Sequence, residues 1–518
     1  MGLIFLLSAC QPPPPAETDL RFYNRASLDL RGVRPTVAEE EALIANPETL
    51  DDRVAAFVRD TRFGSQVQRR FAPIWQTRSD VSDVSQSDLA MENESAFIAS
   101  VGEEPLRIAG YIAEHDLPWT DIVTADWTVV NDIVATRFPV EYPNGETGWK
   151  KVQYTDGRPQ AGVLSSNGLW WRYSTTISNA NRGRVNAISR ILLCKDYQLQ
   201  PVAFDPTLDL TDEALVRDAL INNPACVACH STIDPIGAYL WGFYSEFSDD
   251  ATDWAWYHPD REQHRNDLGI PPAYYGAPGE TIEDLGQQIA ADPRIVSCVT
   301  QRVYETLLQR GITLDDTEAL TRHREALLAG GLTLRALTAS VISDPSYRAL
   351  DSDDAPWKLM DADLYASAVE DLTGYRYAEG GHDAMGEDWL GLRSIAGGGR
   401  TSATTAISPS PTMLEVQERI AQGAATFVVS HDVSDPTHAR LLTHAALSGT
   451  AATELGMLRE QARLLILRIL GKSVVADGAD AASVVELWSV VYAEDHDPKA
   501  AWAAVISALL RDPDFVVY

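Results

Sequence analysis

The 518-residue sequence has few basic residues and no long apolar segment. Its 42 lysines and arginines are set against 74 aspartates and glutamates, which gives a formal net charge of −32 at pH 7. This excess of negative charge argues against nucleic acids and anionic membrane surfaces as binding partners. It suits a basic protein partner or a solvated acidic surface. No run of about 18 uninterrupted apolar residues occurs, so no membrane-spanning helix is predicted.

Cysteine and histidine are also scarce, with 5 and 10 copies respectively, yet three of these residues stand together. The segment Cys226-Val227-Ala228-Cys229-His230 has the Cys-x-x-Cys-His spacing of a c-type haem attachment site. A random chain of this composition contains the pattern on the order of once in a thousand. In such a site each thiol adds to one vinyl group of the porphyrin, and the histidine ligates the iron as the proximal ligand. The sequence therefore predicts one covalent haem c on Cys226 and Cys229, with His230 as iron ligand.

Two other uses of a Cys-x-x-Cys pair fit the sequence less well. A zinc site needs two further ligands at short spacing, and the chain has no second Cys-x-x-Cys. A thioredoxin-like dithiol needs a βαβ context, whereas the flanks here have a helical pattern. Because the haem motif occurs once, conduction along several haems of this chain is not expected.

The residue at the sixth position of the iron would decide the chemistry of such a haem. A methionine thioether raises the reduction potential and suits electron transfer, whereas an open position permits peroxide or oxygen chemistry. No methionine lies between 231 and 359. Met413 follows a proline-rich stretch that resembles the methionine loop of small cytochromes, but it also fits the start of a helix at 412–429. His258 and His264 are the other candidates, with solvated surface histidines or an open iron as alternatives.

The N-terminal segment resembles a bacterial lipoprotein signal. Leu7-Ser8-Ala9-Cys10 follows an apolar run and precedes four prolines. The resemblance implies cleavage before Cys10 and lipidation of its thiol, with residues 1–18 serving as signal and proline-rich tether. The segment has no basic stretch and its apolar run is short, so a chance match is the alternative.

Export also permits disulfides, so Cys194 and Cys298 are predicted to pair, with two buried free thiols as the alternative.

Apolar periodicity predicts a mainly α, multi-domain protein with the haem motif in a central helical domain. The predicted domains are an N-terminal helical domain at 19–140, a haem-bearing domain at 141–350 and a C-terminal helical domain at 351–518. Asp-Pro pairs at 292–293, 344–345 and 512–513 are expected to end one helix and cap the next. A helix is predicted at 119–136, and a turn at Asp234-Pro235-Ile236-Gly237.

Several segments together resemble a family of large exported bacterial proteins best known from planctomycetes. The segment 122–131, with Ala125-Asp126-Trp127-Thr128 and Asn131, is similar to that family's "ADYTxxN" phrase. The segments 160–166 and 182–184 resemble its "GGLLT…RG" region, and 223–237 is close to its "NPxCxxCHxxxDPxG" core. The likeness covers roughly residues 80–350, is weaker over 19–79, and reaches 351–518 only through short phrases. It implies an exported c-type haem protein and supplies no substrate.

These observations lead to one expected function and two alternatives. The expectation is an exported, lipid-anchored monohaem cytochrome on the periplasmic side, in the outer membrane or at the cell surface, exchanging electrons with a redox protein partner. The first alternative is a haem peroxidase or oxidase with an open distal site and an acid–base residue such as His258. The second is a surface protein with a structural haem. No hydrolase, metalloprotease or EF-hand motif with enough context competes.

Overall fold

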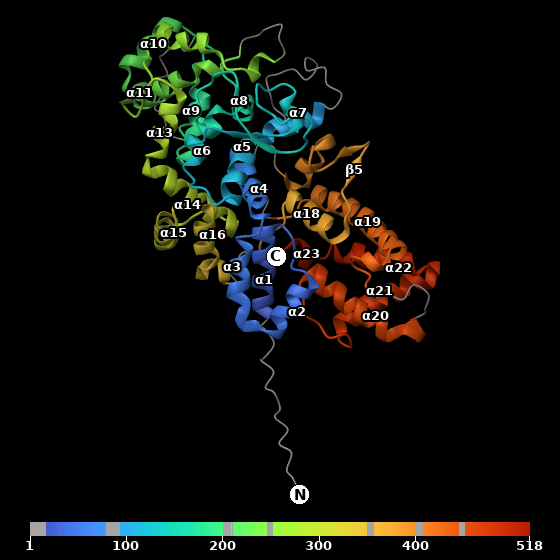
Figure 1. Ribbon diagram of the computed structural model, residues 1–518. Helices are drawn as coiled ribbons and strands as arrows, with labels where there is room; N and C mark the ends of the chain where they lie inside the picture. The colour runs from blue at the N-terminus through green and yellow to red at the C-terminus, as the bar shows by residue number, and fades with distance from the viewer. Residues whose placement is uncertain are drawn as a thin grey trace.

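The computed structural model describes residues 17–78, 94–199, 209, 211–245, 252–349, 357–398, 408–444 and 451–518. It is mainly helical, which confirms the predicted fold class. Within the described ranges, strands form only three two-stranded antiparallel sheets. Figure 1 shows the green helices of the haem-motif region at one end, the blue N-terminal helices at the centre, and the orange and red C-terminal helices on the other side.

The first helices of the chain are α1 (Glu17–Arg31), α2 (Val37–Ala45), α3 (Leu50–Phe57), α4 (Phe63–Trp75) and α5 (Glu94–Glu114). The central region contains α6 (Asp121–Thr124), α7 (Asp132–Ala135), α8 (Asn167–Arg172), α9 (Arg182–Leu192), α10 (Glu213–Asn222), α11 (Pro224–Gly237), α12 (His264–Leu268), α13 (Ile282–Ala290), α14 (Pro293–Leu308), α15 (Thr317–Ala329), α16 (Leu334–Ile342) and α17 (Pro345–Arg348). The last helices are α18 (Ala362–Thr373), α19 (Pro411–Ser434), α20 (Ala451–Leu465), α21 (Ala479–Asp495), α22 (Pro498–Leu509) and α23 (Pro513–Val516). The sheets pair β1 (Thr128–Val130) with β2 (Lys150–Val152), β3 (Ala273–Tyr274) with β4 (Ala277–Pro278), and β5 (Ala378–Glu379) with β6 (His382–Asp383).

The Asp-Pro pairs begin helices as the sequence predicted. Asp292, Asp344 and Asp512 each cap a helix, and in each case the aspartate side chain accepts a hydrogen bond from the backbone N–H two residues on. The proline that follows occupies the first helical position, where no intrahelical N–H is needed. This device sets the starts of α14, α17 and α23.

Three hydrophobic cores are buried among the described residues, and the two larger ones divide the chain near residue 350. The larger core contains buried residues from Leu20 to Tyr347, so the predicted boundary at 140 lies inside one continuous core. The second core runs from Met360 to Val516 and also takes in Leu28 of α1. Helix α1 therefore contributes apolar side chains to both, and it lies between the two groups of helices in Figure 1.

Two local predictions were wrong. The segment 119–136 is not one helix but α6, β1 and α7, because the β-branched run Thr128-Val129-Val130 pairs with β2, with Thr128 opposite Val152. The segment Asp234-Pro235-Ile236-Gly237 is not a turn but the last turn of α11. Pro235 is tolerated in this helix, whose C-terminal end is fixed by side-chain contacts described below.

A buried ionic cluster joins the beginning and end of the chain. Asp29 on α1 accepts hydrogen bonds from the ammonium of Lys358, from Tyr347 at 2.6 Å and from Tyr518 at 3.0 Å. Residues 358 and 518 are themselves paired through reciprocal backbone hydrogen bonds of 2.9 and 2.8 Å. The Asp29 cluster, defined as these four residues, therefore links α1 and α17 to the C-terminal segment.

Candidate haem-attachment site

The Cys-x-x-Cys-His motif lies on helix α11. Asn223 caps this helix by accepting a hydrogen bond from the N–H of Ala225 at 3.0 Å, and Pro224 is the first helical residue. Cys226, Cys229 and His230 are spaced i, i+3 and i+4, which places their side chains on one face of the helix. Both thiols are partly exposed and neither forms a disulfide.

The imidazole of His230 is held through only one of its two nitrogens. Nδ1 lies 3.0 and 3.2 Å from the two carboxylate oxygens of Asp234, one helical turn further on. Nε2 has no hydrogen-bond partner among the described residues. A histidine that ligates a metal commonly donates its other N–H to a carboxylate, which fixes the tautomer and the ring orientation. The ring of His230 is therefore arranged with Nε2 available for a metal.

Arg182, the first residue of α9, holds Asp234 in turn. Its Nε and terminal nitrogen approach the two carboxylate oxygens at 2.7 and 3.0 Å, which is a bidentate ion pair. Asp234 is 8% exposed and Arg182 is 25% exposed. Burial raises the pKa of Asp234, but the hydrogen bonds from His230 and Arg182 outweigh it and leave that pKa below its usual value. The carboxylate is thus a charged partner for both side chains.

The turn before α9 fixes the C-terminal end of α11. The amide of Asn181 donates to the carbonyl oxygen of Gly237 at 3.0 Å, and Arg184 donates to that of Phe243 at 3.0 Å. A Cβ at Gly237 would lie 2.8 Å from the carbonyl oxygen of Ala180, so only glycine allows this close approach. The segment 181–184 therefore positions the motif-bearing helix.

The other segments that carried the family resemblance support the surrounding core. Thr128 donates to buried Glu104 on α5 at 2.7 Å, and the amide of Asn131 donates to Ser100 at 2.9 Å. Tyr154 also donates to Glu104, whose pKa is raised because burial outweighs these hydrogen bonds. These polar residues hold β1 and the loop before α8 against α5, so their role in the structure is packing.

The described surroundings of α11 fit a covalently attached haem. Helix α10 packs against α11, yet it leaves Leu215 47% exposed and Ile221 70% exposed. Apolar side chains beside a haem exclude water from the porphyrin. The site thus combines two thiols that form no disulfide, an imidazole nitrogen without a hydrogen-bond partner among the described residues, and two exposed apolar side chains on the adjacent helix. Among the described residues, those of α11 included, no group of three or more His, Cys, Asp or Glu side chains is arranged to hold a metal ion.

The residues predicted for the sixth position lie on elements other than α11, and each stays a prediction. Met413 is buried in the first turn of α19, and this helix lies far from α11 in Figure 1. His258 lies on the loop packed against the residues that follow α11, and its Nε2 donates to the carbonyl oxygen of Asp253 at 2.8 Å. The ring of His264 lies against Trp241, with ring centroids 5.2 Å apart. The methionines of the described residues all lie beyond residue 359, outside the region that carries the motif.

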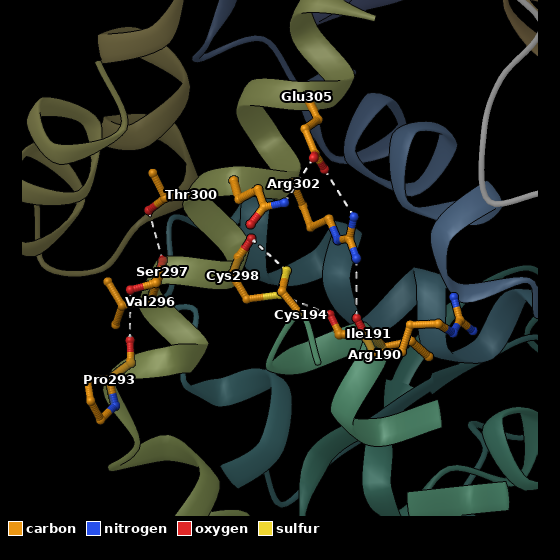
Figure 2. The surroundings of a disulfide bond; sticks show 11 residues. Arg190, Ile191, Cys194, Pro293, Val296, Ser297, Cys298, Thr300, Arg302 and Glu305 are labelled. Atoms are coloured by element: carbon orange, nitrogen blue, oxygen red, sulfur yellow. Dashed lines mark hydrogen bonds and ion pairs between the residues drawn. A yellow bond between two sulfur atoms is a disulfide. The ribbon is translucent and has the colours of Figure 1, made fainter. Parts of the chain in front are cut away.

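Cys194 and Cys298 form a disulfide that joins the end of α9 to α14, with Cα atoms 5.2 Å apart. Figure 2 shows Arg302 beside it, bridging the same two helices. Arg302 donates to the carbonyl oxygen of Arg190 at 3.4 Å and pairs with Glu305 at 3.0 Å. The helix that supplies Arg182 is therefore cross-linked to the following bundle. Cys10, the predicted lipidation site, lies outside the described residues.

The pairing that sequence reasoning missed is that of Arg182 with Asp234. The two residues are 52 positions apart and lie on different helices. Both stand inside segments that carried the family resemblance, and this was the one available hint.

None of the described helices is both long and apolar enough to cross a membrane. No protein-family model matches the chain, and no curated protein or solved structure matches it either.

Proposed function

We propose that the protein is an exported, lipid-anchored monohaem c-type cytochrome that exchanges electrons with a redox protein partner. The observation that carries this proposal is the arrangement on α11. Cys226, Cys229 and His230 share one face, neither thiol forms a disulfide, and Nε2 of His230 has no hydrogen-bond partner among the described residues. When bound, the haem supplies a one-electron redox centre.

The residues of this chain would hold the haem in three ways. Cys226 and Cys229 would each form a thioether, with the sulfur bonding to one vinyl carbon and the thiol hydrogen going to the other, so no oxidant would be needed. His230 would ligate the iron through Nε2 while Asp234 keeps Nδ1–H engaged. The exposed leucine and isoleucine of α10 would offer apolar cover.

Export is supported by the cysteine usage of the chain. The Cys194–Cys298 disulfide is of a kind that forms and persists in oxidising compartments. Haem attachment and lipidation would use the other three cysteines, Cys226, Cys229 and Cys10, so each of the 5 cysteines has a role. The net charge of −32 suits a partner with a basic docking surface, because complementary charge speeds association.

The test is to express the chain together with a haem-attachment system and to record optical spectra of the oxidised and reduced protein. We expect haem that stays with the chain under denaturing conditions and a sharp reduced α-band. The double variant Cys226→Ser with Cys229→Ser should lose all covalent haem. The matched control, Cys194→Ser with Cys298→Ser, removes two cysteines of the same chain and should keep it.

Two results would contradict the proposal. If the wild-type chain carried no covalent haem, the central claim would fail. If the haem were attached but high-spin, and its spectrum shifted on addition of peroxide or cyanide, the peroxidase or oxidase alternative would replace electron transfer.

A further inference from the structure

The carboxylate of Asp234 connects a partly exposed arginine to the imidazole predicted to ligate iron. It accepts two hydrogen bonds from Arg182, at 2.7 and 3.0 Å, and lies 3.0 Å from Nδ1 of His230. Asp234 is 8% exposed and His230 is 23% exposed. A nearly buried negative charge therefore lies on the far side of the imidazole ring from Nε2, with a positive charge behind it.

We infer that Asp234 is a positioning residue that lowers the reduction potential of the haem iron, with Arg182 as its counter-charge. This inference rests on the proposed function. A carboxylate that accepts the Nδ1 hydrogen increases the electron density of the imidazole and raises its basicity as a ligand. A more basic ligand and a nearby negative charge both stabilise ferric over ferrous iron, because the ferric ion carries one more positive charge.

The electron balance of this step is simple. One electron from the redox partner reduces ferric to ferrous iron, no bond to the protein forms or breaks, and Asp234 stays charged throughout. Because Asp234 would disfavour the ferrous state, this haem would need a more strongly reducing partner than the same haem without that carboxylate. The described methionines all lie beyond residue 359, and Met360 and Met385 belong to the second core, whereas Cys229 packs against the first.

The charges of Asp234 and Arg182 are opposite, so removing each of them should shift the reduction potential in opposite directions. Asp234→Asn removes the negative charge but keeps the shape, so the ratio of reduced to oxidised haem at a fixed ambient potential should rise at least tenfold, or 59 mV for one electron. Arg182→Gln removes the positive charge and should change the same ratio in the opposite direction, by about threefold or more. The measurement is a redox titration of the haem-loaded full chain, followed by its reduced α-band.

Structural damage alone would not produce shifts of opposite sign. The matched control is Asp316→Asn, because Asp316 forms a similar fork with Arg310, with oxygen–nitrogen distances of 2.7 and 2.8 Å, at the start of α15. Helix α15 lies apart from α11 in Figure 1, so this variant should leave the potential unchanged. Haem content and the thermal midpoint are measured for every variant, which shows whether each still folds and carries haem.

The outcomes separate this inference from the proposed function. A wild-type chain without covalent haem would overturn the proposed function and the inference with it. A haem-loaded chain in which both variants shift the potential in the same direction, or in which neither shifts it, would overturn the inference alone. A shift in Asp316→Asn equal to that in Asp234→Asn would do the same, because the effect would then not depend on contact with His230.

Discussion

Two buried aspartates, Asp29 and Asp234, have similar charge-assisted hydrogen bonds and opposite relations to solvent. Asp29 is 1% exposed, and its partners Lys358, Tyr347 and Tyr518 are enclosed with it in the protein. Asp234 is 8% exposed, and one of its partners, His230, has a ring nitrogen without a partner in the described chain. The first network ends inside the protein, and the second ends at an atom that is available to a ligand.

The two sites differ in what the partners of the buried carboxylate do for the structure. Removing a carboxylate from water is costly and must be compensated by charges and hydrogen bonds. Burial raises the pKa of Asp29, but Lys358 and Arg25 outweigh it and hold that pKa below its usual value. Its partners come from α17 and from residues 358 and 518, so the compensation ties α1 to the end of the chain. At Asp234 the same compensation orients one imidazole ring.

The largest effect is expected at the Asp29 cluster. Lys358→Met removes the ammonium and leaves Asp29 as a buried charge without its lysine. We expect a loss of about 3–5 kcal/mol in the free energy of unfolding, measured by urea denaturation. The double variant Asp29→Asn with Lys358→Met should recover part of this loss, because it removes the stranded charge as well.

A second lysine of the C-terminal segment provides the control. Lys472 pairs with Asp514, but these side chains are 41% and 40% exposed. Exposed ion pairs contribute about 0–1 kcal/mol, so Lys472→Met should cost no more than that. If Lys358→Met cost as little stability as Lys472→Met, the Asp29 cluster would not hold α1 to the end of the chain. The contrast between Asp29 and Asp234 would then fail.

A smaller effect is expected where α11 meets the turn before α9. In Gly237→Ala the added methyl would lie 2.8 Å from the carbonyl oxygen of Ala180, so one of the two segments must move. Such overpacking costs about 1–3 kcal/mol, measured as the change in free energy of unfolding. It should also weaken the Asn181 hydrogen bond to the carbonyl of residue 237.

Gly183→Ala is the matched control for this change. Gly183 is also helical, but a Cβ there would meet its nearest neighbour, an oxygen of Asn179, at 3.6 Å, which is an ordinary contact. Alanine is the better helix former by about 1 kcal/mol, so this variant should be neutral or slightly stabilising. Equal destabilisation by both substitutions would show that the close approach at Gly237 is not what fixes α11.

The sequence was sufficient for features that depend on neighbouring residues. The helical class, the Asp-Pro starts of α14, α17 and α23, and the motif at 226–230 can all be read from short windows. The haem itself stays a prediction. The segment 119–136 was misjudged because its apolar residues fit a helical period, whereas β-branched Thr128-Val129-Val130 pair with a strand 20 or so residues later.

Features that depend on distant residues could not be predicted. Arg182 and Asp234 are 52 positions apart, and Lys358 and Tyr518 are 329 and 489 positions from Asp29. Charged residues are common in this chain, and no local pattern says which of them will be buried together. The helical end of α11 was missed for the same reason, because its fixing contacts come from Asn181 and Arg182.

Another buried carboxylate, Glu40, extends the comparison because no lysine or arginine of the described residues forms a hydrogen bond or an ion pair with it. The amide of Asn24 donates to one of its oxygens at 3.1 Å, and the other oxygen has no partner among the described residues. Burial is the main cause that raises the pKa of Glu40 to about 8, opposed by Asn24 and by the more distant charge of Arg34.

The sign of the resulting pH dependence follows from linkage. Between about pH 4.5 and 8 the folded chain keeps the Glu40 proton while the unfolded chain has released it, so the free energy of unfolding falls as pH rises. The slope from this one group is at most about 1.4 kcal/mol per pH unit. Glu40→Gln should remove it, so that the variant gains stability relative to the wild type as pH increases from 6 to 7.

The exposed neighbour offers the control Glu41→Gln, which should leave the slope unchanged. If Glu40→Gln left the slope as it was, Glu40 would be charged in the folded chain at neutral pH. The amide of Asn24 and a distant arginine would then be enough to keep a buried carboxylate charged, as Lys358 does for Asp29.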